Sequence, residues 1–334
     1  MTATALELPV LADVLAARER IRKYLPQTEL SSYTSLSELV GTEVWVKREN
    51  DLPTGAFKVR GGVNLVSQLT EHELRAGLIA ASTGNHGQSV AYAAKLFGTQ
   101  AIICVPAGAN PVKVASMRSL GADVIFHGRD FDDAREHAEQ LAGERSYRYV
   151  HSGDEPHLIA GVATATIEII EEQPQIDTII VAVGGGSGAA GACIAGKAIR
   201  PDLKVVGVQS EAAPAAYRSW KAGRLLDDRM ETFAEGIATR VGFELPQRAM
   251  RDLDDFVLVS EDAIRSATVQ MIEGTRALVE PAGAAPLAGA LSLRSQLAGR
   301  TVALICSGGN ITLLQLSELL APLRSGRVAA AQTT

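Results

Sequence analysis

The stretch that decides the fold is KRENDLPTGAFKVRGG, residues 47–62. The apolar residues 44–46 predict a short strand before it, the Asn, Asp, Pro and Gly of residues 50–55 predict a turn, and a helix is expected after Ala56. Lys58 then lies in the first turn of that helix, where the positive helix end opposes a cation by about 0.3–1 kcal/mol and lowers its pKa. Such a lysine suits a neutral amine that adds to a carbonyl, although this stretch alone fits a solvated surface lysine better.

Beyond this stretch, short apolar segments alternate with helical patterns. Strands are predicted at residues 78–81, 101–105, 123–126, 178–183, 204–209 and 301–306, and residues 211–256 are less regular. Strict alternation of strand and helix predicts parallel sheets with helices on both faces, which is an α/β fold. With 334 residues and 46% hydrophobic content, the chain is long enough for two linked lobes.

Composition narrows the possible partners. The formal net charge of -6 gives no basic field for nucleic acid, and no Lys- or Arg-rich run suggests a membrane surface. The uncharged run at residues 178–196 holds six glycines, so a buried strand, a glycine loop and a packed helix explain it better than a membrane span. Cys104, Cys193 and Cys306 are widely spaced in apolar segments and fit neither disulfides nor a metal site. We therefore expect a cytoplasmic protein whose partner is a small molecule or a second copy of itself.

Three polar turns follow predicted strands. Residues 184–188, GGGSG, open a helix and offer backbone N–H groups to an anion such as phosphate, although a loop kept small for packing is the alternative. Residues 82–87, STGNHG, could hold a carboxylate, although His86 alone could be structural. Residues 307–310, SGGN, end the last strand. Because ligands gather at the carboxyl ends of parallel strands, these turns and Lys58 predict one site.

These four stretches, in this order and spacing, resemble the motifs of the fold type II pyridoxal-phosphate enzymes, which include threonine and serine dehydratases, serine racemase and tryptophan synthase β. The resemblance covers about residues 20–320. It implies two open twisted parallel-sheet domains, with the active site in the cleft between them. We expect residues 1–76 and 151–334 to form a large domain that binds pyridoxal 5'-phosphate, and residues 77–150 to form a small domain inserted in it.

The resemblance also implies roles for individual residues. Lys58 would form the Schiff base with the cofactor aldehyde and, once released, would remove the α-proton of the substrate. Phe57 would pack beside the pyridine ring, Asn85 would hydrogen-bond the ring hydroxyl, and Ser307 would contact the ring nitrogen. The phosphate would be held by Gly184, Gly185, Gly186, Ser187 and Gly188, and the substrate carboxylate by Ser82, Thr83, Asn85 and His86.

The activity implied is β-elimination from a β-hydroxy amino acid such as L-threonine or L-serine, which yields a 2-oxo acid and ammonia. A serine at the ring nitrogen leaves that nitrogen largely unprotonated and favours prompt loss of a β-substituent. Alternatives on the same scaffold are racemisation, dehydration of 3-hydroxyaspartate, β-replacement, and cofactor binding without turnover. Thr83 stands where serine racemase has its second acid/base serine, which disfavours racemisation. A homodimer is expected by analogy.

Two further groups of residues bear on ligands. Metal-dependent relatives have acidic ligands where this chain has Gln209, Ala213 and Ala215, so no divalent-cation site is expected. An arginine at the distal end of the pocket would favour a substrate with a second carboxylate, as in 3-hydroxyaspartate. The alternative is that such a residue is an ordinary surface or structural charge. The candidates for that end are Glu235, Arg240 and Arg276.

Overall fold

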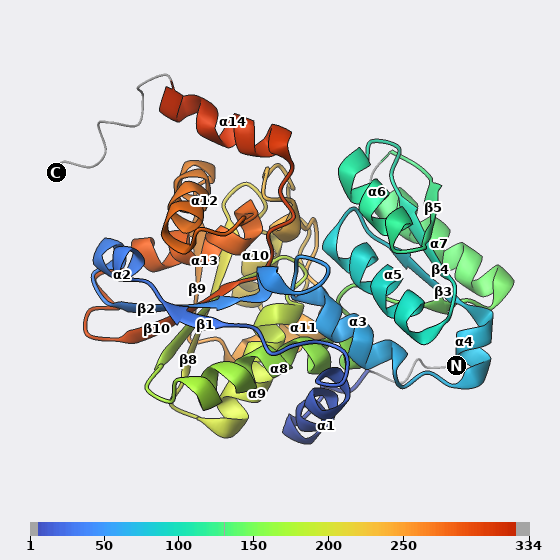
Figure 1. Ribbon diagram of the computed structural model, residues 1–334, viewed down its shortest axis with the longest axis horizontal. Helices are drawn as coiled ribbons and strands as arrows, with labels where there is room; N and C mark the ends of the chain where they lie inside the picture. Colours follow the sequence, from blue (N-terminus) through green and yellow to red (C-terminus); the bar gives the residue numbers. More distant parts are fainter. Residues whose placement is uncertain (1–5, 130, 325–334) are drawn as a thin grey trace.

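The computed structural model describes residues 6–129 and 131–324, which form two β-sheets with helices on both faces (Figure 1). The larger sheet has six strands in the order β1-β2-β10-β7-β8-β9, and the smaller has four in the order β5-β4-β3-β6. Neighbouring strands are parallel except β1, which is antiparallel to β2. The predicted α/β fold is confirmed, and the short antiparallel edge strand is an addition to it.

In the larger sheet, alternate residues face opposite layers of helices. Val302 and Leu304 of β10 join the core on one face, whereas Ala303 and Ile305 join the core on the other. The strands are β1 (Leu30–Ser32), β2 (Glu43–Arg48), β7 (Thr178–Ala182), β8 (Lys204–Ser210), β9 (Asp255–Val259) and β10 (Thr301–Cys306). The first face carries α2 (Thr34–Val40), α12 (Glu261–Thr275) and α13 (Pro281–Ser292), and the second carries α8 (Pro156–Glu172), α9 (Ser187–Ile199) and α10 (Ala215–Ala222).

The smaller sheet is formed by one continuous part of the chain. Its strands are β3 (Leu78–Ala81), β4 (Ala101–Val105), β5 (Asp123–Phe126) and β6 (Arg148–Tyr149). One face is covered by α5 (Asn85–Phe97) and α6 (Pro111–Ser119), and the other by α7 (Phe131–Arg145). The helix α3 (Lys58–Val66) packs on both α5 and α8, so it lies between the two sheets (Figure 1).

The remaining elements connect or flank these layers. They are α1 (Leu11–Ile21), α4 (Glu71–Ala76), α11 (Glu244–Ala249), α14 (Leu313–Arg324) and the 3-10 turns η1 (Glu49–Asp51), η2 (Glu235–Ile237) and η3 (Met250–Asp252). Residues 211–256, expected to be less regular, contain only short elements, among them α10, α11 and the start of β9. These elements are short, so periodicity gave little signal.

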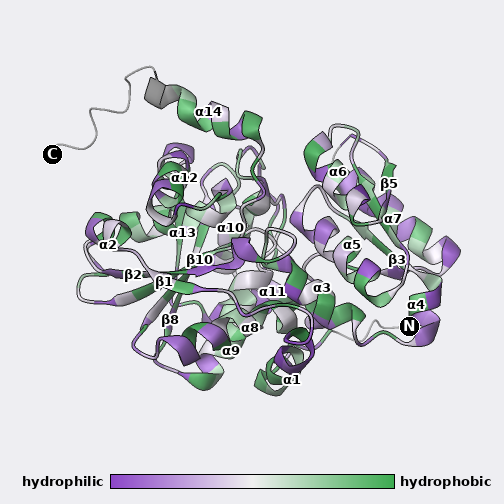
Figure 2. Ribbon diagram, in the orientation of Figure 1, coloured by the Kyte–Doolittle hydropathy of each residue, from purple (hydrophilic) through white to green (hydrophobic). Residues whose placement is uncertain are grey.

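The central strands are apolar throughout, as expected for strands buried on both faces. Every residue of β3 and β4 is buried. In Figure 2, β8 is largely hydrophobic, whereas α1 shows both hydrophobic and hydrophilic residues. Residues 178–196 form β7 and the buried helix α9, and within the described ranges no helix is long and apolar enough to cross a membrane. Cys104, Cys193 and Cys306 are free and buried, as the sequence predicted.

Candidate active site

The turn before Lys58 is held against the end of β10. The backbone N–H of Phe57 donates to the carbonyl of Ser307 at 3.0 Å, and Ala56 pairs with Gly308 in an isolated antiparallel bridge. Gly55 allows the turn, because its φ of 67° lies in the left-handed region that favours glycine. The structure therefore brings the first and last of the four predicted stretches together.

Lys58 is the first residue of α3 and its amine points at the start of α9. Its Nζ donates to Oγ of Ser187 at 2.8 Å and to the carbonyl of Ser152 at 3.2 Å, and it lies 5.4 Å from the ring centroid of Phe57. Burial lowers the pKa of Lys58 to about 8. The side chain is thus half-buried and hydrogen-bonded, with a lowered pKa, and it is not the solvated surface lysine that the stretch alone favoured.

The glycine loop follows β7 and leads into α9. Its missing side chains make room for protein neighbours, because a Cβ on Gly184 would lie 2.6 Å from the carbonyl oxygen of Gly236, and one on Gly185 would lie 2.4 Å from the Phe243 ring. Gly186 has a φ of 92°, and no side chain caps α9. The packing explanation therefore accounts for part of the loop, while the uncapped N-terminus remains available to an anion.

Ser187 and Gly188 connect that loop to Lys58 and Phe57. Ser187 is buried and accepts the hydrogen bond from Lys58. A Cβ on Gly188 would lie 3.3 Å from the Phe57 ring. An amine, a hydroxyl, an uncapped helix N-terminus and an aromatic ring therefore meet at one place, and this set of groups fits a phosphate-bearing aromatic aldehyde.

The polar turn after β3 leads into α5. The N–H of Gly84 donates to Oγ of the buried Ser82 at 3.1 Å, and Thr83 is half-buried. The His86 ring Nε2 lies 3.0 Å from the carbonyl oxygen of Val150, which requires a proton on Nε2. Burial, and then the charge of Lys58, lower the pKa of His86 to about 3, so the ring is neutral near pH 7. His86 therefore has a structural hydrogen bond and also lies close enough to Lys58 to respond to its charge.

Two partners of Asn85 had no predicted role. Its Nδ2 donates to Oε1 of Glu280 at 2.6 Å, and its Oδ1 accepts from Nδ2 of Asn310 at 2.8 Å. Asn310 ends the predicted stretch 307–310, so the signal for it was present in the sequence. Glu280 stands directly before Pro281 at the start of the apolar helix α13 and resembles an ordinary helix-start residue there. Burial raises the pKa of Glu280.

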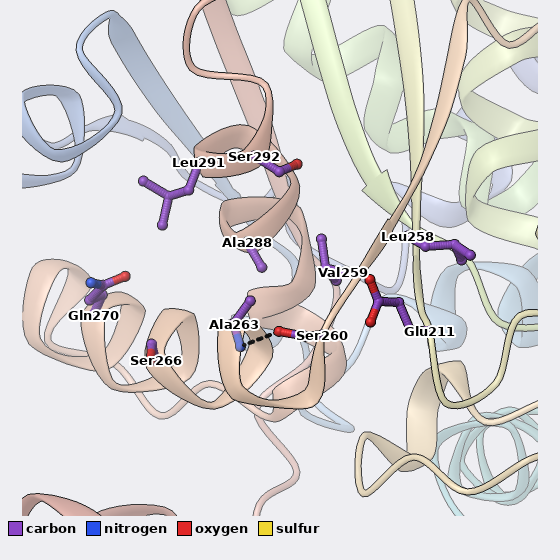
Figure 3. Close-up of a pocket in the computed structure, with 10 residues that line it drawn as sticks. All are labelled: Glu211, Leu258, Val259, Ser260, Ala263, Ser266, Gln270, Ala288, Leu291 and Ser292. Atoms are coloured by element: carbon purple, nitrogen blue, oxygen red, sulfur yellow. Dashed lines mark hydrogen bonds between the residues drawn. The ribbon is translucent and has the colours of Figure 1, made fainter. Parts of the chain in front are cut away.

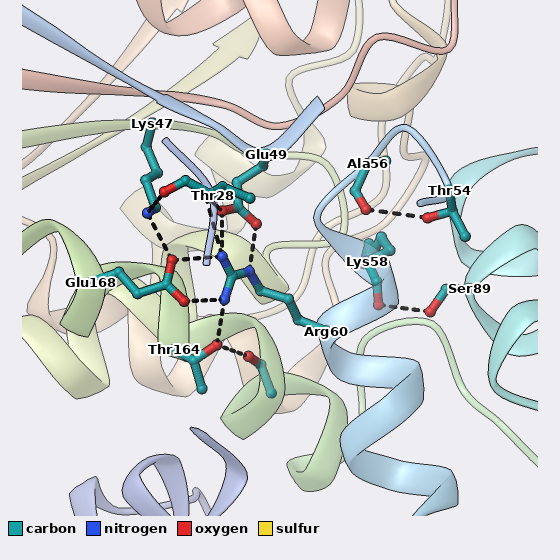
Figure 4. A network of polar contacts seen from close by, with 11 residues as sticks. Thr28, Lys47, Glu49, Thr54, Ala56, Lys58, Arg60, Ser89, Thr164 and Glu168 are labelled. Carbon is teal, nitrogen blue, oxygen red and sulfur yellow. Dashed lines mark hydrogen bonds and ion pairs between the residues drawn. The ribbon is translucent and has the colours of Figure 1, made fainter. Parts of the chain in front are cut away.

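A buried ionic network holds α3 in place (Figure 4). The guanidinium of Arg60 pairs with Glu49 at 2.7 Å and with Glu168 at 2.6 Å, and Lys47 pairs with Glu168 at 2.7 Å. Burial opposes the charge on Arg60, but the carboxylates of Glu49 and Glu168 outweigh it and raise the pKa of Arg60. The network ties β2, η1 and α8 to the helix that begins with Lys58, and no sequence pattern indicated it.

The three residues expected at the distal end of the pocket differ in their positions. Glu235 pairs with the buried Lys113, whose Nζ would lie 3.5 Å from a Cβ on Gly84 in the polar turn. Arg240 is 59% exposed and lies 3.7 Å from Asp132, and Arg276 is exposed at the end of α12. Only Glu235 of these three is thus linked to the polar turn.

Two other features of the described residues are a cavity and the arrangement of possible metal ligands. A cavity of about 370 Å³ lies between α12, α13 and the end of β9 (Figure 3), and its lining includes Ser260, Ala263, Gln270 and Ala288 but none of the predicted site residues. Within residues 6–129 and 131–324, no group of three or more His, Cys, Asp or Glu is arranged to hold a metal ion.

Comparison with known proteins agrees with the four motifs. A family model for pyridoxal-phosphate dependent enzymes matches residues 21–308. The L-threonine ammonia-lyase of Thermotoga maritima is 36% identical over 332 residues, which cover 97% of this chain and 81% of that protein. The L-threo-3-hydroxyaspartate ammonia-lyase of Saccharomyces cerevisiae is 33% identical over 321 residues, 96% of this chain and 98% of that protein.

A solved structure shows the same similarity in three dimensions. The crystal structure of serine racemase from Dictyostelium discoideum matches with a TM-score of 0.86 and 32% sequence identity, covering 91% of this chain and 99% of that one. The resemblance inferred from the sequence is confirmed. This chain belongs to the family of pyridoxal-phosphate dependent enzymes, with the fold of its type II members.

Proposed function

We propose that the protein converts L-threonine or L-serine to a 2-oxo acid and ammonia by β-elimination. The observation that carries this proposal is the contact between Nζ of Lys58 and Oγ of Ser187, which joins a reactive amine to the uncapped start of α9. The reaction balances without an added oxidant or reductant, because the water lost with the β-hydroxyl is regained when the product hydrolyses and releases ammonia.

The groups around Lys58 suit the cofactor. Backbone N–H groups of residues 184–188 and the hydroxyl of Ser187 would hold the phosphate, Phe57 would lie beside the ring, and Asn85 and Ser307 would contact its oxygen and nitrogen. When bound, pyridoxal phosphate supplies an electron sink for the α-carbon of the substrate. The hydroxyl of Ser307 carries no charge, so it adds little to that sink and favours early departure of a β-substituent.

Lys58 is the group that moves protons. With a pKa of about 8, its amine exchanges a proton near neutral pH more readily than an ordinary lysine does. Ser187 Oγ and the Ser152 carbonyl accept its hydrogen bonds and therefore orient Nζ. We propose that Lys58 removes the α-proton of the substrate while backbone N–H and hydroxyl groups of Ser82, Thr83, Asn85 and His86 hold the substrate carboxylate.

The relatives support this reaction class and leave one alternative substrate and one alternative reaction to be tested against it. The similar proteins include an L-threonine ammonia-lyase, an L-threo-3-hydroxyaspartate ammonia-lyase and a serine racemase. The cation beside the polar turn, Lys113, is already paired with Glu235. A second carboxylate on the substrate would find that cation neutralised, which favours the uncharged side chains of threonine and serine.

The deciding experiment supplies the purified protein with L-threonine, L-serine and L-threo-3-hydroxyaspartate and measures 2-oxo acid, ammonia and the chirality of the remaining amino acid. We expect oxo acid from threonine or serine, together with a visible absorption band of bound cofactor. The Lys58→Ala variant should lose turnover and keep its circular dichroism spectrum, whereas Lys95→Ala, which changes an exposed lysine of α5, should keep both. D-amino acid without oxo acid, or no visible band, would contradict the proposal.

We also propose the remaining features of the molecule by analogy with the family. Residues 1–76 and 151–334 would form the large domain and 77–150 the small one, which is supported by a smaller sheet made only from strands within residues 78–149. A cytoplasmic homodimer is proposed, and sedimentation of the purified protein tests its oligomeric state.

A further inference from the structure

A chain of side-chain amides runs from the turn before Lys58 to the buried Glu280. Nδ2 of Asn310 donates to the carbonyl oxygen of Thr54 at 2.8 Å and to Oδ1 of Asn85 at 2.8 Å. Nδ2 of Asn85 then donates to Oε1 of Glu280 at 2.6 Å. Four residues from distant parts of the sequence are therefore joined in one directed series of hydrogen bonds.

The direction of this series is fixed by its two ends. The backbone carbonyl of Thr54 can only accept, so the amide nitrogen of Asn310, and not its oxygen, must face it. The second hydrogen on that nitrogen then goes to the amide oxygen of Asn85. At the other end, a carboxyl oxygen of Glu280 accepts from the amide nitrogen of Asn85. The orientation of the Asn85 amide therefore follows from its neighbours.

One side-chain hydrogen-bond donor of Asn85 is not used in this series. An amide nitrogen carries two hydrogens, and Asn85 gives one of them to Glu280. Its oxygen is directed at Asn310. What Asn85 presents to a ligand is thus an N–H group, which requires a hydrogen-bond acceptor on that ligand.

We propose that Glu280 is a positioning residue that, with Asn310, orients Asn85 to donate an N–H to the ring oxygen of the cofactor. This inference rests on the proposed placement of the cofactor ring against Asn85. It assigns that ring oxygen as an acceptor, so the site stabilises its deprotonated form. Glu280 does not itself touch the ring in this assignment and acts through Asn85.

The carboxyl of Glu280 is held firmly enough for this role. Glu280 is 3% exposed, and its backbone N–H donates to the carbonyl of Gly308 at 3.1 Å. A Cβ on Gly308 would lie 2.1 Å from Oε1 of Glu280, so the position beside Ser307 must be glycine while the carboxyl is there. The same oxygen that receives the Asn85 hydrogen bond is therefore enclosed between Asn85 and the end of β10.

The test titrates cofactor-free protein with pyridoxal phosphate and follows the visible absorption spectrum at several pH values. Glu280→Ala should weaken cofactor binding by about tenfold, the size of one buried hydrogen bond. It should also shift the spectrum toward the form with a protonated ring oxygen. Glu280→Gln should bind within about twofold of wild type, because its amide oxygen can accept the same hydrogen bond.

Two more variants separate positioning from a general loss of stability. Asn310→Ala removes the other partner of Asn85 and should shift the spectrum in the same direction, which keeps the test valid if Glu280→Ala does not fold. Glu261→Ala is the matched control, because its carboxylate near the start of α12 accepts hydrogen bonds from Thr232 and Phe233 outside this series. It should lower the melting temperature and leave the spectrum unchanged.

Several outcomes would overturn the inference. An unchanged spectrum and affinity in both Glu280→Ala and Asn310→Ala would show that Asn85 needs no such support. If Glu280→Gln is as weak as Glu280→Ala, the charge of Glu280 matters and its acceptor oxygen does not. A wild-type protein that takes up no pyridoxal phosphate would instead contradict the proposed function, so the two failures are distinguishable.

Discussion

The guanidinium of Arg60 donates to both carboxylate oxygens of Glu168, from Nη1 to Oε1 at 2.6 Å and from Nη2 to Oε2 at 2.7 Å, inside the protein. Arg60, which forms this bidentate pair, lies two residues after Lys58 on the same helix. Glu49 pairs with the remaining side of the guanidinium. The position of the reactive amine therefore depends on a set of charges that are largely shielded from water.

Removing Arg60 should be severely destabilising. Arg60→Met leaves Glu49 and Glu168 buried, with Lys47, which pairs with Glu168, as the remaining cation of the network. Breaking such a buried pair typically costs about 3–5 kcal/mol. The free energy of unfolding in urea measures this loss. Arg75→Met is the matched control, because Arg75 pairs with Glu71 on the surface, where the side chains are 71% and 90% exposed, and it should cost less than about 1 kcal/mol. Equal losses in the two variants would contradict this account.

Lys58 should lower the stability of the cofactor-free protein near neutral pH. Burial lowers the pKa of Lys58 to about 8 from its ordinary value of 10.5, so between these values the unfolded chain binds more protons than the folded one. Stability therefore rises with pH through this window, and the full penalty is present below pH 8. Lys58→Met should stabilise the cofactor-free protein at pH 7 by roughly 1 kcal/mol, allowing for partial exposure.

Thermal unfolding at pH 7 and at pH 10 checks this prediction. The gain from Lys58→Met should shrink at the higher pH, because the wild-type amine is then neutral in the folded state. Lys95→Met, at an exposed position of α5, should show no such pH-dependent difference. A gain that is the same at both pH values would mean that packing, and not charge, is responsible.

Close packing of α3 on α8 should make Gly161 intolerant of a methyl group. A Cβ there would lie 2.7 Å from the carbonyl oxygen of Arg60 and from Cα of Gly61. Gly161→Ala should therefore force the two helices apart and cost about 1–3 kcal/mol. Gly143→Ala, inside α7 with no atom within 4 Å of the added Cβ, should instead stabilise the protein by about 0.5–1 kcal/mol. Denaturant unfolding of both variants measures the contrast.

The parts of the site predicted from sequence are those with local signals. Turns rich in Gly, Ser and Asn follow apolar strands and indicate Lys58, Gly184 and Ser307 as site residues from local sequence alone. The structure brings these turns together. The strands were found because buried parallel strands are continuous apolar runs. The role of each site residue toward the cofactor stays a prediction.

What the sequence could not reveal depends on contacts between distant residues. Glu168 lies in the middle of an apolar helix, and nothing in its neighbours indicates that Arg60 pairs with it. Glu280 looks like a residue that begins a helix, and its partner Asn85 is almost two hundred residues away. Such pairings are set by packing of whole layers, and hydrophobic periodicity carries no information about them.

The order of strands in the larger sheet has a consequence for how the chain is made. β10, which follows every other described strand in the sequence, lies in the interior of the sheet between β2 and β7. Until residues 301–306 have been synthesised, β1 and β2 cannot join β7, β8 and β9 through it, and both groups present an unpaired edge to other chains. Ser307 and Gly308 follow directly after this strand, so the turn before Lys58 meets its backbone partners only once residues 301–308 have been synthesised.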